Sequence, residues 1–381
     1  MPGIYIHVPF CKQACHYCDF HFSTSLKYKN DFINALLKEI ELQAGYLKEN
    51  AALQETGVES IYFGGGTPSI LTQEDLFRIF DQIAKYHTIL PQAEITLEAN
   101  PDDLDLNKLK LLKQTPVNRL SIGIQSFHEE DLRWMNRAHS ATQSLNAVKR
   151  SQDIGFKNLT IDLIYGFPIL SDIKWEQNLK TIIDLDVPHV SSYCMTVEPR
   201  TKLADFIKKG KTTPMDEEQA ARHFEMLTYH LKGQGYQHYE ISNFCKEEHY
   251  SRHNSNYWKG EKYLGLGPSA HSFNGNTRQW NVANNQNYIA SLNQGHLSFE
   301  KEELSANQKY NEYVLTTLRT IWGTSLDVIN NNFGKDFLNH CIKEAQPHIE
   351  KDWLISENSI LYLSEQGKLM ADKIASDLFR D

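Results

Sequence analysis

Hydrophobic and polar positions in the first half of the chain alternate between short apolar runs and longer amphipathic stretches. Six runs rich in β-branched and aromatic residues have the length of buried strands, and they cover residues 4–8, 60–63, 94–99, 119–124, 158–164 and 189–195. A helix-like stretch follows each run, for example over residues 27–50, and this alternation is typical of βα units in a parallel sheet. The pattern therefore predicts an α/β fold, a partial parallel barrel of six βα units rather than a closed eight-stranded one.

The regular alternation ends after residue 200. A helical pattern covers residues 216–232, and an aromatic- and histidine-rich stretch follows over 236–280. From about residue 303 the pattern predicts helix, helix, short strand pair and helix, the outline of a winged-helix-like module. We therefore predict a barrel over residues 1–200, a capping segment over 201–302 and a winged-helix-like C-terminal domain over 303–381.

The composition narrows the function classes. With 40% hydrophobic and 23% charged residues, the chain resembles an ordinary soluble globular protein. The 39 Lys and Arg residues against 48 Asp and Glu residues give a net charge of −9, which disfavours a dedicated nucleic-acid binder. The first residues lack a basic segment, and their apolar run is too short for a signal peptide or a membrane span, so we expect a cytoplasmic location.

Three of the six cysteines crowd together directly after the first predicted strand. Cys11, Cys15 and Cys18 have the spacing Cys-x3-Cys-x2-Cys, on a loop where a barrel presents its ligands. Three thiolates would leave one iron of a four-iron cluster open to an outside ligand. A structural zinc site is the alternative, with His16 or His21 as a further ligand, because thiolates suit both metals.

A glycine run closes the second predicted strand. Residues 64–68 read Gly-Gly-Gly-Thr-Pro. Glycines without a β-carbon let the backbone come close to a bound ligand, although a glycine run alone is more often a simple turn. Its place one strand after the cysteines makes a ligand-binding loop the better interpretation.

Polar side chains also lie where predicted strands end. Glu98 ends the third strand, Gln125 follows the fourth and Asp162 lies in the fifth, so their acceptor oxygens are expected at one barrel mouth. Each of them, taken singly, is explained equally well as a buried and hydrogen-bonded polar residue. Cys194 and Cys245 are interpreted as small buried hydrophobic residues.

Taken together, these motifs resemble the radical SAM superfamily, over the whole chain. The segments Tyr5-Ile-His-Val-Pro-Phe-Cys11, Cys15-His-Tyr-Cys18-Asp-Phe20 and Phe63-Gly-Gly-Gly-Thr-Pro68 look like the oxygen-independent coproporphyrinogen III oxidase-like group, and within it the HemW-type haem chaperones are the most similar. The resemblance implies a 4Fe-4S cluster on the three cysteines and S-adenosylmethionine chelated at the open iron. The positions that match the family's contacts to S-adenosylmethionine are Tyr5, Tyr17, Gly65, Gly66, Thr67, Glu98, Gln125, Arg137 and Asp162.

Two features separate the branches of this group. The oxidases, which decarboxylate a porphyrinogen, carry a further cysteine two residues after the third one, where this chain has Phe20. They also carry an N-terminal extension, for which Cys11 so near the start leaves no room. We therefore expect a haem chaperone, with an oxygen-independent coproporphyrinogen III oxidase as the alternative. The resemblance implies that the fold cleaves S-adenosylmethionine reductively, and no residue is assigned a catalytic role.

The segment His253-Asn254-Ser255-Asn256-Tyr257-Trp258 reproduces the His-Asn-x-x-Tyr-Trp motif that the chaperone branch associates with haem. In this interpretation His253 supplies an axial imidazole, while Tyr257 and Trp258 offer flat faces to the porphyrin. The structural alternative is a cluster of aromatic rings packed against the barrel, and His271 is a second candidate imidazole. The implied partners are haem, an acceptor haemoprotein such as a respiratory cytochrome, and a low-potential electron donor such as flavodoxin or ferredoxin. A homodimer is left open.

Overall fold

The computed structural model describes residues 1–48 and 57–380. All six predicted strands are present, as β1 (Gly3–Val8), β2 (Val58–Gly65), β3 (Ile89–Ala99), β4 (Arg119–Gln125), β5 (Asn158–Tyr165) and β6 (His189–Cys194). They pair in chain order, and every pair among them is parallel. The predicted α/β fold is confirmed.

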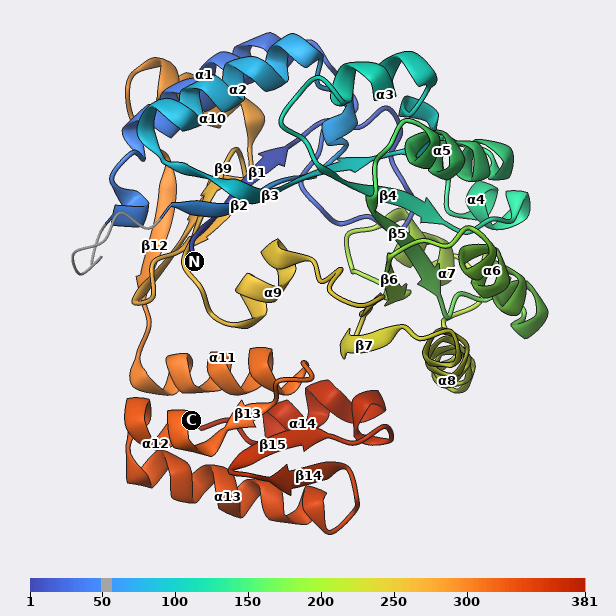
Figure 1. Ribbon diagram of the computed structural model, residues 1–381, viewed down its shortest axis with the longest axis vertical. Helices are drawn as coiled ribbons and strands as arrows, with labels where there is room; N and C mark the ends of the chain where they lie inside the picture. Colours follow the sequence, from blue (N-terminus) through green and yellow to red (C-terminus); the bar gives the residue numbers. More distant parts are fainter. Residues whose placement is uncertain (49–56, 381) are drawn as a thin grey trace.

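The alternation of side chains along each strand explains how this sheet is covered. In β1, Ile4, Ile6 and Val8 are completely buried in the main hydrophobic core, while Tyr5 and His7 have the opposite parity and so lie on the other face of the sheet. Helices pack on the outer face of the sheet, as Figure 1 shows. They are α1 (Lys29–Leu42), α2 (Gln73–Tyr86), α3 (Leu106–Leu112), α4 (Glu129–Trp134), α5 (Ala141–Asp153) and α6 (Asp172–Asp184). The helix predicted over 27–50 ends at Leu42, and residues 49 and 50 of that prediction lie outside the described residues.

The sheet is larger than the sequence predicted. In the described part of the chain it has twelve strands, in the order β12-β11-β10-β9-β1-β2-β3-β4-β5-β6-β8-β7. The six added strands extend both edges, and they are β7 (Gln237–Glu240), β8 (Asn243–Cys245), β9 (Tyr263–Leu266), β10 (His271–Phe273), β11 (Thr277–Asn281) and β12 (Phe299–Glu303). Most of them lie in the stretch 236–280, where no strand was predicted. Strands of three to five residues are too short to show a clear alternation.

Four helices connect these added strands or precede them, namely α7 (Lys202–Lys208), α8 (Glu217–Gly233), α9 (Arg252–Trp258) and α10 (Asn285–Asn293). The helix predicted over 216–232 is α8, which begins after the cap residue Asp216. Helix α9 is the exception to the outer layer, because it lies on the inner side of the curved sheet (Figure 1). It carries the whole of the predicted haem motif, residues 253–258.

The C-terminal region has a hydrophobic core of its own, which includes Tyr310, Val314, Leu318 and Ile329. Its elements are α11 (Ala306–Leu318), β13 (Thr324–Ser325), α12 (Leu326–Phe333), α13 (Lys335–Ile349), β14 (Leu354–Glu357), β15 (Ile360–Leu363) and α14 (Ala371–Asp377). Three helices therefore precede the strand pair, where the sequence pattern predicted two. The domain boundaries that the sequence predicted after residues 200 and 302 remain predictions. Within the described residues, no helix is long and apolar enough to cross a membrane.

Candidate cofactor site at the carboxyl ends of the strands

A cavity of about 430 Å³ lies where the central parallel strands end. Its walls come from the cysteine loop after β1 and from strands β2 to β6. Eleven of the twelve residues predicted for the cluster and for S-adenosylmethionine line it, namely Cys11, Cys15, Tyr17, Cys18, Gly65, Gly66, Thr67, Glu98, Gln125, Arg137 and Asp162. The exception is Tyr5, whose ring stacks beside that of Tyr62, with 6.2 Å between the centroids.

Backbone hydrogen bonds hold the cysteine loop at the cavity. The Cys11 amide donates to the Ser23 carbonyl at 3.0 Å, and the Thr67 amide donates to the Phe10 carbonyl at 2.7 Å. All three thiols are partly buried. Burial raises the pKa of the Cys11 thiol and raises that of Cys18 to about 12, so both are protonated when no metal is present. Metal binding there would release protons.

Arg137 joins the cysteine loop to the strand ends. Its Nη1 lies 3.4 Å from Sγ of Cys15 and 3.5 Å from the Tyr17 hydroxyl. Its Nη2 donates to Oδ1 of Asn100 at 2.6 Å and to the Gly123 carbonyl at 2.8 Å. The positive charge of this partly buried side chain therefore faces Sγ of Cys15, and it partly offsets the rise in the pKa of Cys11.

The described residues do not form the zinc site considered from the sequence. Among residues 1–48 and 57–380, no group of three or more His, Cys, Asp or Glu side chains is spaced to hold a single metal ion. His16 Nδ1 contacts the Trp134 carbonyl at 2.9 Å, and His21 Nε2 contacts Oδ1 of Asn285 at 2.7 Å. A tetrahedral zinc needs four ligands within about 2.3 Å of one point, whereas a cluster spreads its thiolates over different irons. Three thiols on one cavity wall fit a cluster.

The glycine run is required by the packing of the protein itself. Gly65 has a φ of +101°, and a β-carbon on it would lie 2.6 Å from the His7 ring. A β-carbon on Gly66 would lie 2.6 Å from the Phe10 carbonyl oxygen, and the Gly66 amide donates to the Val8 carbonyl at 2.9 Å. The missing side chains therefore let the loop after β2 close on β1 and on the start of the cysteine loop.

Two partly buried carboxyl groups face the cavity. Glu98 accepts a 2.7 Å hydrogen bond from the Tyr62 hydroxyl, and Asp162 accepts one from Ser121 at 3.1 Å. Burial raises the pKa of Glu98 to about 8, and the nearby charge of Asp162 adds to this effect. Burial also raises the pKa of Asp162 to about 6. In the described chain neither carboxylate forms a salt bridge, so a cationic ligand in the cavity would be attracted to both.

Gln125 reaches the cavity through an irregularity of β4. Its φ is +66°, and the pairing of β4 with β5 shifts register between Gly123 and Gln125. A positive φ is uncommon for a residue other than glycine, and bulges near the end of a strand often redirect a side chain toward a binding site.

The cavity also contains residues that the sequence analysis missed. Four of them are Tyr62, Asn100, Ser121 and Tyr193. The three that belong to strands, namely Tyr62, Ser121 and Tyr193, have side chains on the same face of the sheet as Glu98 and Asp162. The period of two could have found them. Cys194 was predicted wrongly, because it is exposed and lines the cavity, whereas Cys245 is buried as predicted.

The predicted haem residues have different neighbours. His253 lies inside the barrel, where its Nδ1 is 2.9 Å from the Ser60 hydroxyl and its ring is 5.1 Å from that of Tyr62. Tyr257 is 49% exposed. Trp258 packs under the guanidinium of Arg319, at 5.3 Å. Their binding of haem stays a prediction.

Comparison with known proteins places these features in a family context. Residues 5–182 match the sequence profile of the Radical SAM superfamily. The chain is 32% identical to the "Heme chaperone HemW" of Bacillus subtilis over 98% of both chains. It is also 32% identical to the protein of that name from Mycobacterium tuberculosis, over 99% of this chain and 94% of that one. The solved structure of coproporphyrinogen III oxidase (HemN) from Escherichia coli superimposes with a TM-score of 0.84, at 21% identity, over 99% of this chain and 90% of that chain.

Proposed function

The chain belongs to the HemW family of the radical SAM superfamily, and we propose that it binds haem and delivers it to haemoproteins. The observation that carries this proposal is the complete motif over residues 253–258, in a chain that matches HemW proteins along nearly all of its length. The cavity at the strand ends would serve as the cofactor site of the same protein.

We propose that Cys11, Cys15 and Cys18 hold a 4Fe-4S cluster and that S-adenosylmethionine binds beside it. The charge of the ligand supports this assignment, since S-adenosylmethionine carries an ammonium and a sulfonium group, and Glu98 and Asp162 are partly buried acids at the cavity. The cluster would supply the electron for reductive cleavage when a low-potential donor reduces it. The protein's part is to hold the thiols, exclude water and fix the orientation of the ligand.

For haem, we propose a binding surface around Tyr257 and Trp258. The exposed Tyr257 ring lies 5.6 Å from that of Tyr263. One cation in the same region is Lys259, which lies 4.3 Å from the ring centre of Trp322. Arg319, which stacks on Trp258, is already paired with Glu240 and Asp372. Aromatic faces suit the porphyrin plane, and cations suit its propionates.

Oxygen-independent coproporphyrinogen III oxidation is the second candidate function. The fold of the Escherichia coli oxidase is shared over nearly the whole chain, but its sequence is only 21% identical, so the likeness concerns the fold alone. Phe20, which lines the cavity and is 66% exposed, occupies the position of the oxidases' further cysteine. This difference favours the chaperone function.

Haem titration of anaerobically prepared protein tests the proposal. We expect a saturable change in the Soret band for the wild type, and an affinity at least about tenfold lower for Trp258→Ala, because a buried aromatic contact contributes about 1.5 kcal/mol or more. Tyr229→Ala is the control, since Tyr229 is 79% exposed on α8, away from the motif. Equal affinities for the wild type and the Trp258 variant would contradict the proposed surface, and no Soret change in the wild type would contradict haem binding itself.

A further inference from the structure

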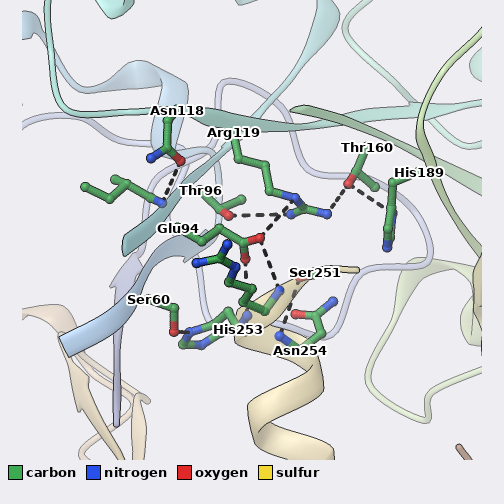
Figure 2. Close-up of polar contacts among 12 residues, drawn as sticks. Ser60, Glu94, Thr96, Asn118, Arg119, Thr160, His189, Ser251, His253 and Asn254 are labelled. Atoms are coloured by element: carbon green, nitrogen blue, oxygen red, sulfur yellow. Dashed lines mark hydrogen bonds and ion pairs between the residues drawn. The ribbon is translucent and has the colours of Figure 1, made fainter. Parts of the chain in front are cut away.

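Helix α9 begins against a buried carboxylate inside the barrel. Glu94 is 5% exposed and accepts hydrogen bonds from the backbone amides of Arg252, at 3.1 Å, and of His253, at 3.2 Å. Arg119 balances this charge, because it is 1% exposed and its Nε lies 3.8 Å from Glu94. Arg119 also donates to Thr160, as Figure 2 shows. The start of the motif helix is therefore fixed to strands β3, β4 and β5.

The His253 ring is held by contacts on two sides. Its Nδ1 lies 2.9 Å from the Ser60 hydroxyl on β2 (Figure 2). The ring stacks on Tyr62 with a centroid distance of 5.1 Å and an interplanar angle of 27°, and on Tyr5 with 6.3 Å and 28°. Tyr5 and Tyr62 are register partners in the β1–β2 pair, so His253 packs across two neighbouring strands. Burial and the nearby Arg119 charge lower the pKa of His253 to about 4, so it packs as a neutral ring.

The same tyrosine reaches the cofactor cavity. The Tyr62 hydroxyl donates to Oε1 of Glu98 at 2.7 Å, and both residues line the cavity. A single aromatic ring therefore separates His253 from the carboxylate. A tyrosine hydroxyl can donate in one fixed direction only while its ring is kept in place by the groups packed on its faces.

We infer that His253 is a positioning residue of the cofactor cavity, whose ring holds Tyr62 so that the Tyr62 hydroxyl donates to Glu98. This inference rests on the proposed binding of S-adenosylmethionine in the cavity. The two sides of helix α9 would then have different roles. Its inner residue His253 supports the cavity, while Tyr257 and Trp258 remain available to haem. An axial iron ligand from His253 is the competing role.

Binding of S-adenosylmethionine to cluster-loaded protein, measured anaerobically by calorimetry, tests this role. We expect Tyr62→Phe to weaken binding about tenfold, because it removes the hydrogen bond that orients the Glu98 carboxyl group at the cavity. His253→Asn keeps a polar group for Ser60 but removes the ring, and we expect it to weaken binding about fivefold. His253→Phe restores a ring and should bind within about twofold of the wild type.

The double variant Tyr62→Phe/His253→Asn shows whether the two residues act through one contact. If His253 acts through Tyr62, the double variant should bind like Tyr62→Phe alone, about tenfold weaker than the wild type, whereas independent effects would give about fiftyfold. Asn256→Ala is the matched control on α9, because its side chain contacts the Met1 carbonyl and Glu59 at 3.3 Å rather than the cavity. The control should bind S-adenosylmethionine like the wild type.

Haem titration of the same variants separates this inference from the proposed function. Normal haem binding with weakened S-adenosylmethionine binding in His253→Asn supports the positioning role. Unchanged S-adenosylmethionine binding in His253→Asn, multiplied effects in the double variant, or failure of His253→Phe to restore binding would each overturn it. Loss of haem with unchanged S-adenosylmethionine binding would assign His253 to the iron instead. If the wild type binds no S-adenosylmethionine, the proposed cofactor site is wrong and the inference falls with it.

Discussion

Nη1 of Arg137 lies 3.4 Å from Sγ of Cys15, so a partly buried cation faces the middle cysteine of the loop. The same guanidinium donates to Asn100 and to the Gly123 carbonyl. The cysteine loop is thereby tied to the ends of β3 and β4 before any metal is bound.

Arg137→Met should therefore lower both stability and cluster content. It leaves the Asn100 and Gly123 oxygens without their donor, which we expect to reduce the free energy of unfolding by about 2–3 kcal/mol. Iron and sulfide per chain should also fall after anaerobic reconstitution. Arg133→Met on α4 is the control, since Arg133 is exposed. Equal iron content in Arg137→Met and the control would contradict this role.

Replacing Cys11, Cys15 or Cys18 by Ala should abolish the charge-transfer absorbance of the cluster, because each thiolate is expected to bind a different iron. Cys245→Ala should retain the absorbance, since Cys245 is buried outside the cavity. The measurement is the visible spectrum with iron analysis. A triple Cys variant that keeps its full iron content would show that these thiols are not the ligands.

The cysteine, glycine and acceptor positions were predictable because each follows from a local pattern. Cys11, Cys15 and Cys18 are close in the sequence, and Glu98 and Gln125 lie at strand ends that alternation already predicts. A parallel barrel then brings all such ends to one side.

The remaining features depend on contacts between distant residues. Ser60 and His253 are 193 positions apart, and no periodicity relates them. Gly65 is needed because His7 lies against it, which only the paired strands reveal. In the C-terminal region, Gly334 with a φ of +93° separates α12 from α13, where the sequence pattern predicted two helices before the strand pair rather than three.

Gly65→Ala tests the packing of the glycine run. The new methyl group would meet the His7 ring and a φ of +101°, so we expect a loss of about 2 kcal/mol or more in unfolding free energy. Gly155→Ala is the matched control, because Gly155 has a φ of +93° but nothing within 4 Å of an added β-carbon. Denaturant titration should show the larger loss for Gly65. Equal losses would mean that backbone strain alone matters.

Glu98 should make the protein without ligand less stable as the pH rises. The folded state holds its proton up to a pH of about 8, whereas the unfolded chain releases it near the ordinary value of 4.5. The folded state therefore binds more protons between these values, and stability falls as the pH rises through them, by on the order of 5 kcal/mol. Glu98→Gln should remove this slope. The free energy of unfolding, measured in urea for the wild type and for Glu98→Gln from about pH 4.5 to 8, tests this expectation. Parallel plots of that free energy against pH for the two proteins would contradict the raised pKa of Glu98.

The proposed function makes the protein a haem carrier rather than a porphyrinogen decarboxylase. Two parallel anaerobic assays of the cluster-loaded protein distinguish these functions. One sample is titrated with haem, and the other is incubated with coproporphyrinogen III, S-adenosylmethionine and a low-potential reductant. We predict saturable haem binding in the Soret band and no decarboxylated product by chromatography. Decarboxylation of the porphyrinogen with no haem bound would contradict the proposed haem delivery.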